Sequence, residues 1–185
     1  MRVIGLAGWS GAGKTTLLTK LIPVLNGRGH TVSTLKHAHH GFDVDRPGKD
    51  SFEHRAAGAQ EVLVASGRRW ALVHELRGAP EPSLAALLQR LSPVDLVIVE
   101  GFKAARHPKL EVHRVANGKP FLFRDMPNVR VIAADAAVPD SPVPVIPLDD
   151  VDAVADAVLA HAAALEDVLA ALTAGPVLAG ASAPA

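Results

Sequence analysis

Hydrophobic positions in the first part of the chain follow two different spacings. Arg2 to Ala7 is a short, largely apolar run that predicts a buried strand. After a stretch rich in glycine, apolar side chains recur at helical spacing. They are Leu17, Leu18, Leu21, Ile22 and Leu25. Gly27 and Gly29 end this pattern, and the β-branched run Thr31 to Leu35 predicts a second strand. The predicted order is strand, glycine loop, helix, strand.

The remaining apolar segments predict both strands and helices. Val94 to Val99 is nearly continuous, which is typical of a parallel strand covered on both faces. Glu61–Ala65 and Trp70–Glu75 flank a Ser-Gly turn and predict an antiparallel hairpin added to the sheet. Further strands are predicted at Leu110–Val115, Val129–Ala133 and Val145–Ile146, and helices at Ser51–Ala57, Ser83–Leu91 and from Asp149 or Asp150 to about Leu172. Alternating strands and helices indicate an α/β fold with a mostly parallel sheet between helical layers.

The length favours one domain. A chain of 185 residues buries roughly 70% of the surface that its unfolded form exposes. We predict a single domain over residues 1–172. The segment 173–185 is rich in Ala, Gly, Ser and Pro and carries no charge, which predicts a disordered tail.

Charge and cysteine content limit the classes of partner and of chemical site that the chain can have. The formal net charge is zero, and no run of Lys and Arg would form a basic stripe, so we expect neither nucleic acid nor an anionic membrane as a partner. No apolar run approaches the ~18 residues of a membrane span. Cysteine is absent, which excludes disulfides, thiolate metal sites and a cysteine nucleophile, and suits a reducing cytoplasm. The anionic partner expected is a small molecule in the cytoplasm.

The segment Gly8-Trp9-Ser10-Gly11-Ala12-Gly13-Lys14-Thr15 matches the P-loop pattern G-x-x-x-x-G-K-[ST] at every fixed position. It follows a predicted strand and precedes a predicted helix, as phosphate binding requires. Glycines let backbone N–H groups turn around a phosphate, and the helix N-terminus adds partial positive charge. Lys14 is expected to contact the β and γ phosphates, and Thr15 to offer its hydroxyl to Mg²⁺. The fold predicted is therefore the three-layer P-loop NTPase fold, with an added hairpin.

An acidic residue follows the predicted strand of residues 94–99. Glu100 is expected to emerge at the carboxyl end of its strand beside the P-loop, where it could hold a Mg²⁺-bound water or orient a nucleophile. Asp95 lies at the opposite end of the same strand and is therefore a poor candidate for Mg²⁺.

A polar segment with three histidines and two aspartates follows the second strand. Asp43 and Asp45 could bind Mg²⁺ directly or through water, because this ion prefers oxygen ligands. His37, His39 and His40 could instead bind a transition metal, since imidazole suits Zn²⁺ and Ni²⁺. One short tract without a distant ligand is a weak metal signature, so contacts with a nucleotide or a partner are favoured.

Several tracts together resemble one family. They are the P-loop, the tract 36–51 (Lys-His-Ala-His-His-Gly-Phe-Asp-Val-Asp-Arg-Pro-Gly-Lys-Asp-Ser), His54–Ala59, Val99–Lys103 and Lys109–Arg114. On these tracts the chain resembles the molybdopterin-guanine dinucleotide biosynthesis adaptor family, MobB, over about Arg2 to Leu159. The P-loop alone is generic, whereas the combination is specific.

The resemblance implies a homodimeric GTP-binding protein with weak Mg²⁺-dependent GTPase activity. Such a protein assists the molybdenum cofactor guanylyltransferase, which joins GMP to molybdopterin, and molybdopterin itself is a possible ligand. Lys14, Glu100 and Asp45 are then the expected catalytic residues, and Thr15, Asp45 and Glu100 the expected metal ligands. Lys103, Glu111 and Arg114 become candidates for a second site or the dimer face, or else are solvent-facing charges on a loop and an edge strand.

The expected nucleotide-binding residues combine the P-loop with two positions elsewhere. They are Gly8, Ser10, Gly11, Ala12, Gly13, Lys14, Thr15, Thr16, His37 and Asp135. The N-K-x-D tetrapeptide that reads guanine in many GTPases is missing, so a preference for GTP rests on the family resemblance. Asp135, after a late strand, is the predicted base contact because its carboxylate could accept the N1 and N2 hydrogens of guanine.

Two other functions compete with the adaptor. A P-loop kinase acting on a small molecule would use Glu100 or Asp45 to position the acceptor hydroxyl, but it needs an arginine-bearing lid that the sequence does not offer. A nickel-delivery GTPase is the second alternative, and the absence of cysteine counts against it.

Overall fold

The computed structural model describes residues 1–38 and 41–174. The chain divides into two compact units, one made of Met1–His37 and Leu84–Ala185 and the other of Ala38–Ser83. We call them unit 1 and unit 2 and describe each by itself. The single domain predicted over residues 1–172 includes residues of both units and stays a prediction. Of the predicted tail, residues 175–185 lie outside the described residues.

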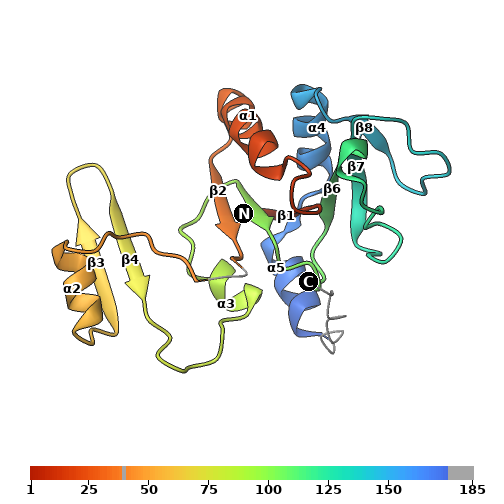
Figure 1. Ribbon diagram of the computed structural model, residues 1–185. Coiled ribbons are helices and arrows are strands. Elements are labelled where there is room, and N and C mark those ends of the chain that lie inside the picture. The colour runs from red at the N-terminus through yellow and green to blue at the C-terminus, as the bar shows by residue number, and fades with distance from the viewer. Residues whose placement is uncertain (39–40, 175–185) are drawn as a thin grey trace. The chain divides into compact units, whose positions relative to one another are not determined.

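Unit 1 is built on a mostly parallel sheet (Figure 1). The strand order is β2 (Val32–Lys36), β5 (Leu96–Glu100), β1 (Arg2–Ala7), β6 (Lys109–His113), β7 (Val129–Ala134) and β8 (Val145–Pro147). All neighbours in this order pair in parallel. The carboxyl ends of these strands therefore meet at one edge of the sheet, and β1, which leads into the P-loop, lies between β5 and β6.

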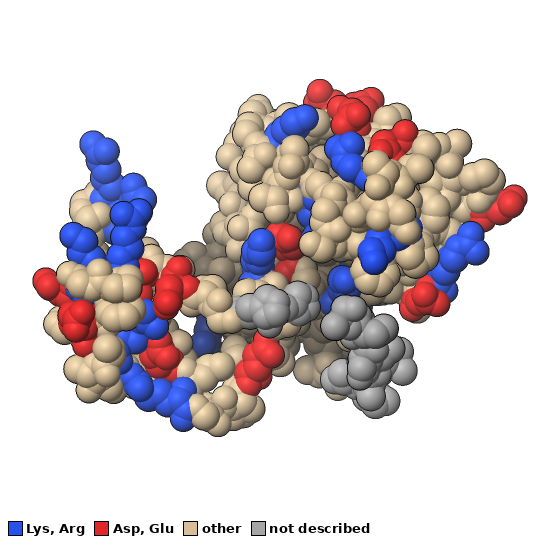
Figure 2. All heavy atoms as spheres, in the orientation of Figure 1, with Lys and Arg blue, Asp and Glu red and all other residues tan. Residues whose placement is uncertain are grey.

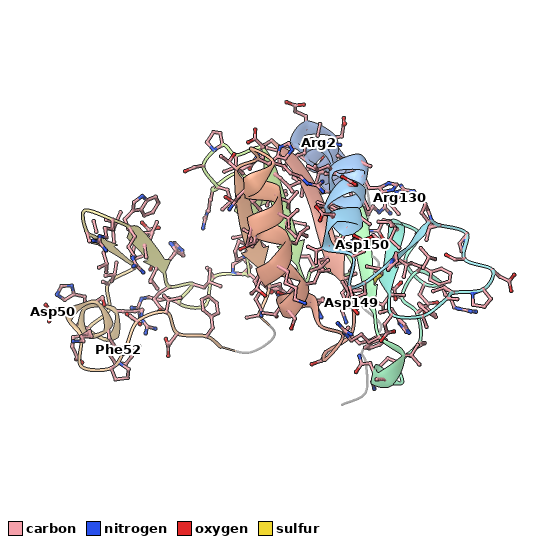
Figure 3. All side chains as sticks on the ribbon, turned by 90° about the horizontal axis from the view of Figure 1, so that it is seen from above. Arg2, Asp50, Phe52, Arg130, Asp149 and Asp150 are labelled. Atoms are coloured by element: carbon pink, nitrogen blue, oxygen red, sulfur yellow. The ribbon has the colours of Figure 1, made fainter. Side chains whose placement is uncertain are left out.

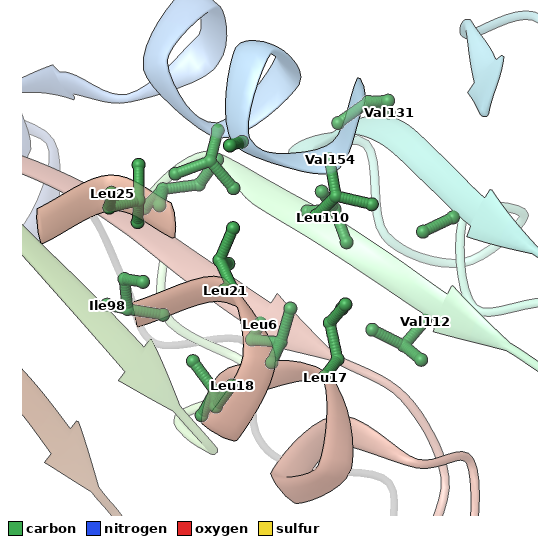
Figure 4. Close-up of a cluster of buried hydrophobic side chains, with 14 of the residues drawn as sticks. Leu6, Leu17, Leu18, Leu21, Leu25, Ile98, Leu110, Val112, Val131 and Val154 are labelled. Carbon is green, nitrogen blue, oxygen red and sulfur yellow. The ribbon is translucent and has the colours of Figure 1, made fainter. Parts of the chain in front are cut away.

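Helices cover both faces of the sheet, which makes unit 1 a three-layer structure. On one face α1 (Lys14–Gly27) and α4 (Val151–His161) pack together over side chains such as Leu6, Ile98 and Leu110 (Figure 4). On the other face α3 (Leu84–Leu88) and α5 (Leu165–Thr173) cover Val3, Val97 and Val99. Successive residues of β1 and β5 thus enter opposite cores, because side chains alternate along a strand. Burial on both faces explains why these strands read as continuous apolar runs.

The predicted last helix is wrong in one respect. Instead of one helix to about Leu172, the chain forms α4 and α5, separated by the short strand β9 (Ala163–Ala164). β9 pairs antiparallel with the start of β1, and the Leu165 N–H donates to the Met1 carbonyl at 3.0 Å. Alanine favours a helix, but pairing with an uncovered stretch of β1 takes precedence here. The predicted helix over Ser83–Leu91 is also shorter, at Leu84–Leu88.

Unit 2 contains α2 (Asp50–Ala56) and a hairpin of β3 (Glu61–Ala65) and β4 (Trp70–His74). The hairpin is antiparallel, as predicted, but it forms a two-stranded sheet of its own rather than an addition to the main sheet. The predicted fold class is confirmed: a mostly parallel sheet between helices, with a separate antiparallel pair.

Candidate functional site

The P-loop joins β1 to α1 with three glycines in conformations that other residues rarely adopt. Gly8, Gly11 and Gly13 have φ angles of 153°, 80° and 93°. At Gly8 an added Cβ would lie 2.6 Å from the Val112 carbonyl oxygen, so the close approach of β6 also requires glycine there. Gly13 is the left-handed residue that precedes the first turn of α1. These glycines leave backbone N–H groups and a helix N-terminus at the same point, as phosphate binding requires.

The Lys14 side chain folds back across the loop. Its Nζ donates hydrogen bonds to the carbonyl oxygens of Gly8 at 2.9 Å and Trp9 at 3.0 Å. The ammonium group is therefore held at the mouth of the loop by two neutral acceptors. A phosphate oxygen would be a stronger acceptor, because charge-assisted hydrogen bonds exceed neutral ones.

Charged side chains next to Lys14 set its electrostatics. Burial lowers the pKa of Lys14, the Glu100 carboxylate raises it, and the positive charges of Lys103 and Lys36 lower it further. Lys36 and Lys103 thus add positive charge near Lys14, and Glu100 adds a negative charge. An excess of positive charge attracts a polyanion.

Glu100 ends β5 and lies level with Leu6 on β1 and Lys36 on β2. Its side chain is 15% exposed, and its Oε2 lies 3.7 Å from Lys36 Nζ. The predicted position at the carboxyl end of the strand, beside the P-loop strand, is confirmed. Asp95 lies at the other end, where its Oδ2 accepts from the N–H and hydroxyl of Thr31, and these bonds lower the pKa of Asp95. Asp95 thus lies at the end of the strand opposite to Glu100, as predicted.

His37 follows β2 and packs beside the end of β5. Its N–H donates to the Glu100 carbonyl at 2.9 Å, and its ring lies 4.6 Å from the Phe102 ring. Gly101, at φ 93°, allows this approach, because a Cβ there would be 2.6 Å from the Cβ of His37. His37 thus lies at the same sheet edge as Glu100. His39 and His40 fall outside the described residues.

The segment that follows β6 contacts the P-loop through Arg114 and Asn117. The Nε of Arg114 lies 3.0 Å from the point that a Cβ of Gly13 would occupy. Asn117, in the 3-10 turn η1 (Val115–Asn117), donates from Nδ2 to the Ser10 carbonyl at 3.0 Å. Asn117 was not among the predicted site residues, and Arg114 was expected at a second site or the dimer face. Local sequence gave no signal for these contacts, because they join residues about 100 positions apart.

Asp135 follows β7, two strands from β1. Its Oδ1 accepts from the Val115 N–H at 2.9 Å, and its Oδ2 lies 3.9 Å from Arg114 Nη1. Asp149, just before α4, lies 3.6 Å from Arg114 Nη2 and is marked in Figure 3. The edge of the sheet therefore carries acids on both sides of the P-loop: Glu100 on β5, and Asp135 with Asp149 beyond β6.

Trp9 gives the loop an aromatic side chain flanked by cations. Lys103 Nζ lies 4.7 Å and Lys119 Nζ 5.8 Å from its ring centroid, and its indole N–H donates to the Pro120 carbonyl at 2.8 Å. Lys103, predicted for a second site or the dimer face, thus lies next to the P-loop.

Comparison with known proteins identifies the family. The model of the family Molybdopterin guanine dinucleotide synthesis protein B, MobB, matches residues 3–135, which is more than half of the chain. The chain belongs to the MobB family. The resemblance drawn from the sequence is thereby confirmed, and membership assigns the chain to molybdopterin guanine dinucleotide synthesis.

Relatives of the MobB family match much of the chain. A molybdopterin-guanine dinucleotide biosynthesis adapter protein of Escherichia coli is 42% identical over 160 residues, covering 85% of this chain and 91% of the relative. One from Haemophilus influenzae is 46% identical over 121 residues, covering 64% and 66%. A crystal structure of molybdopterin-guanine biosynthesis protein B superimposes with a TM-score of 0.68 at 25% identity, covering 85% of this chain and 98% of that one.

Glu111 lies in one of the tracts on which the MobB resemblance rests, but it is not at the surface. It is fully buried on β6, an internal strand, and its carboxylate accepts from the N–H groups of Leu122 at 2.7 Å and Phe123 at 2.8 Å. Burial raises the pKa of Glu111, and the two hydrogen bonds oppose that rise. The alternative of a solvent-facing charge on an edge strand is wrong for this residue. Its carboxylate fixes the backbone at Leu122 and Phe123 by accepting their N–H groups.

The acids of the other MobB tract belong to unit 2. The Arg55 guanidinium lies 2.7 Å from Asp45, 2.8 Å from Asp43 and 3.0 Å from Glu75, measured from nitrogen to oxygen. These hydrogen bonds, that to Glu75 first, raise the pKa of Arg55. Arg55 also lies 5.1 Å above the Phe52 ring. Asp45 is thus part of an ion-pair cluster that orders unit 2, and its roles in catalysis and metal binding stay predictions.

The surface of the MobB-family chain mixes both charges. On the face drawn in Figure 2, acidic and basic side chains occur together on each unit. No helix within residues 1–38 and 41–174 combines the length and apolar character of a membrane span.

Proposed function

We propose that this MobB-family chain is a GTP-binding adaptor with weak, Mg²⁺-dependent GTPase activity. It assists the guanylyltransferase that joins GMP to molybdopterin, which is itself a candidate ligand. The observation that carries this proposal is the P-loop: three glycines with positive φ, and a Lys14 ammonium that donates hydrogen bonds to two neutral carbonyls. A cytoplasmic location stays a prediction.

The P-loop defines two sides for a nucleotide. Lys14 interacts with Glu100 on the β5 side, where the terminal phosphates are expected, while Asp135 lies on the β6 and β7 side, where we place the base. Its carboxylate suits the N1 and N2 hydrogens of guanine and disfavours adenine, which presents a lone pair at N1. Slow hydrolysis is expected because Arg114, the guanidinium beside the loop, lies on the base side and away from Glu100.

Magnesium fits this site only together with a nucleotide. Within the described part of the chain, no three His, Asp or Glu side chains converge as a metal site. Thr15 and Glu100 supply two oxygen donors, and Mg²⁺ is commonly held by one or two carboxylates together with substrate phosphates. When bound, the ion would neutralise phosphate charge. Asp45 remains a further proposed ligand.

A homodimer is also proposed, and the hairpin of unit 2 supports it. Leu63 and Leu72 are paired across the hairpin and are 62% and 47% exposed, and Trp70 on the same face is 65% exposed. Large apolar side chains gathered on one sheet face are typical of a protein interface.

Calorimetric titration tests the proposed function. Mg²⁺-GTP, Mg²⁺-ATP and molybdopterin are titrated into the full chain and into Lys14→Ala, with Lys20→Ala, an exposed lysine of α1, as the matched control. We expect GTP to bind more tightly than ATP, with Lys14→Ala weakening GTP on the order of 100-fold and Lys20→Ala unchanged. GTP binding that is equal in Lys14→Ala and the parent would refute the P-loop assignment.

A phosphate-transfer assay with ATP and a titration with Ni²⁺ separate the alternatives. Tight ATP binding with phosphate transfer to a small acceptor would favour a kinase, and stoichiometric Ni²⁺ binding would favour a nickel-delivery GTPase. Asp45→Asn, compared with Asp43→Asn, tests whether Asp45 contributes to the Mg²⁺ dependence of GTP binding. An unchanged Mg²⁺ titration removes Asp45 from the site.

A further inference from the structure

Arg114 lies directly on the P-loop. The Nε, Nη2 and Cζ atoms of its guanidinium are 3.0, 3.7 and 3.8 Å from the point that a Cβ of Gly13 would occupy. Gly13 precedes Lys14 and stands at the N-terminal end of α1. Glycine at position 13 therefore serves two purposes: it permits the left-handed backbone, and it leaves room for the guanidinium.

Two carboxylates attract this guanidinium without binding it closely. Asp135 Oδ2 is 3.9 Å from Nη1, and Asp149 Oδ1 is 3.6 Å from Nη2. Charge-assisted hydrogen bonds are normally about 2.7–2.9 Å long, so both pairs are loose. Asp135 already accepts the Val115 N–H with its other oxygen at 2.9 Å. A guanidinium in this state can exchange its partners for a planar pair of phosphate oxygens.

The position of Arg114 indicates which part of a nucleotide it would meet. β6 and β5 flank β1 on opposite sides, so Arg114 and Glu100 lie on opposite sides of the loop. The Glu100 carboxylate raises the pKa of Lys14, and Lys14 is expected to contact the terminal phosphates. Arg114 lies between the P-loop and Asp135. A nucleotide with its terminal phosphates at the loop and its base at Asp135 would have its α-phosphate there.

We propose that Arg114 binds the α-phosphate end of the nucleotide, and that Asp135 and Asp149 hold it in place until the nucleotide enters. This inference rests on the proposed function and deepens it. Once the guanidinium turns to phosphate, Asp135 Oδ2 is available to the base. Phosphate binding and base reading are then coupled through one side chain.

The first experiment measures nucleotide affinity in the full chain. Mg²⁺-GTP and Mg²⁺-GDP are titrated into the parent, Arg114→Ala, Arg114→Lys and the control Arg130→Ala, an exposed arginine near the opposite end of β7 (Figure 3). Arg114→Ala is expected to weaken both nucleotides by about the same factor, on the order of 10-fold. Arg114→Lys recovers part of the loss, and Arg130→Ala binds like the parent. Circular dichroism checks that each variant is folded.

The outcomes separate this inference from the proposed function. A parent that fails to bind GTP, or binding that does not depend on Lys14, refutes the proposed function itself. GTP binding that depends on Lys14 but is the same in Arg114→Ala and Arg130→Ala refutes only the role of Arg114. A loss confined to GTP, with GDP unaffected, would place Arg114 at the γ-phosphate and overturn its assignment to the α-phosphate.

A second experiment tests the restraint by the carboxylates. Asp149→Asn removes one partner of Arg114 without touching the proposed base contact, so it is expected to tighten GTP binding by about threefold. In the Arg114→Ala background the same change is expected to have no effect, because the carboxylate acts through the guanidinium. An equal gain in GTP affinity in the parent and in Arg114→Ala would show a general effect of charge. It would refute the proposal that Asp149 holds Arg114 in place.

Discussion

Gly5→Ala is expected to destabilise unit 1 strongly. Gly5 lies in β1, and a Cβ there would be 2.4 Å from His107 Nε2 and 2.8 Å from Lys109 Cγ. Ordinary contacts begin near 3.4 Å, so the neighbours must retreat by about 1 Å. Both neighbours are fully buried and cannot swing into solvent. Overpacking of this kind costs about 1–3 kcal/mol of unfolding free energy.

Urea unfolding followed by circular dichroism measures this loss. Gly27→Ala is the matched control, because Gly27 ends α1 and an added Cβ there meets nothing within 4 Å. Alanine favours a helix over glycine, so Gly27→Ala is expected to unfold at the parent's urea concentration or slightly above it. If Gly5→Ala unfolds at the same urea concentration as Gly27→Ala, the packing of β1 against His107 is not as described.

Three further predictions address pH, a helix cap and assembly. Burial lowers the pKa of His107 to about 3, so at acidic pH the unfolded state binds a proton that the folded state excludes. The unfolding free energy is therefore expected to fall by roughly 1.4 kcal/mol for each unit by which the pH is lowered from 6.5 to 3. His107→Gln reduces this slope and the exposed His54→Gln keeps it, as urea midpoints at several pH values would show; equal slopes would contradict the burial. Asp150→Ala removes the acceptor of the Ala153 N–H at the start of α4 and costs about 1 kcal/mol, whereas the exposed Asp125→Ala leaves the melting temperature nearly unchanged. Leu72→Lys is expected to convert the proposed dimer to a monomer by light scattering, while Arg68→Ala in the hairpin turn does not; a parent that is monomeric at all concentrations refutes the dimer.

The sequence predicted those parts of the fold that depend on local pattern. The P-loop between a strand and a helix, and the continuous apolar run that ends at Glu100, each combine a spacing with a residue type of known chemistry. β9 was missed because its alanines are good helix formers, and only the unpaired start of β1 draws them into a strand. The separate hairpin sheet was missed because strand patterns do not reveal the partner of a strand.

Contacts between distant segments limited the prediction of the site. Arg114 and Asn117 reach the P-loop only because β6 pairs with β1, and nothing in the sequence specifies that neighbour. Glu111 carries a charge and alternates with apolar residues, which is typical of an exposed strand position. Its burial depends on the two N–H groups of residues 122 and 123, which replace water around the carboxylate.

The pairing of β9 with β1 also affects the order in which the protein can be assembled during translation. Arg2 donates to the carbonyl of Ala162, a contact between residues 160 positions apart, and Val3 pairs with Ala163. β1, which leads into the P-loop, leaves the ribosome well before β9, yet the hydrogen bonding at its start is completed by β9. Such non-local pairing slows folding. The start of β1, at the end of the strand opposite to the P-loop, therefore stays unpaired on one side until β9 has been synthesised.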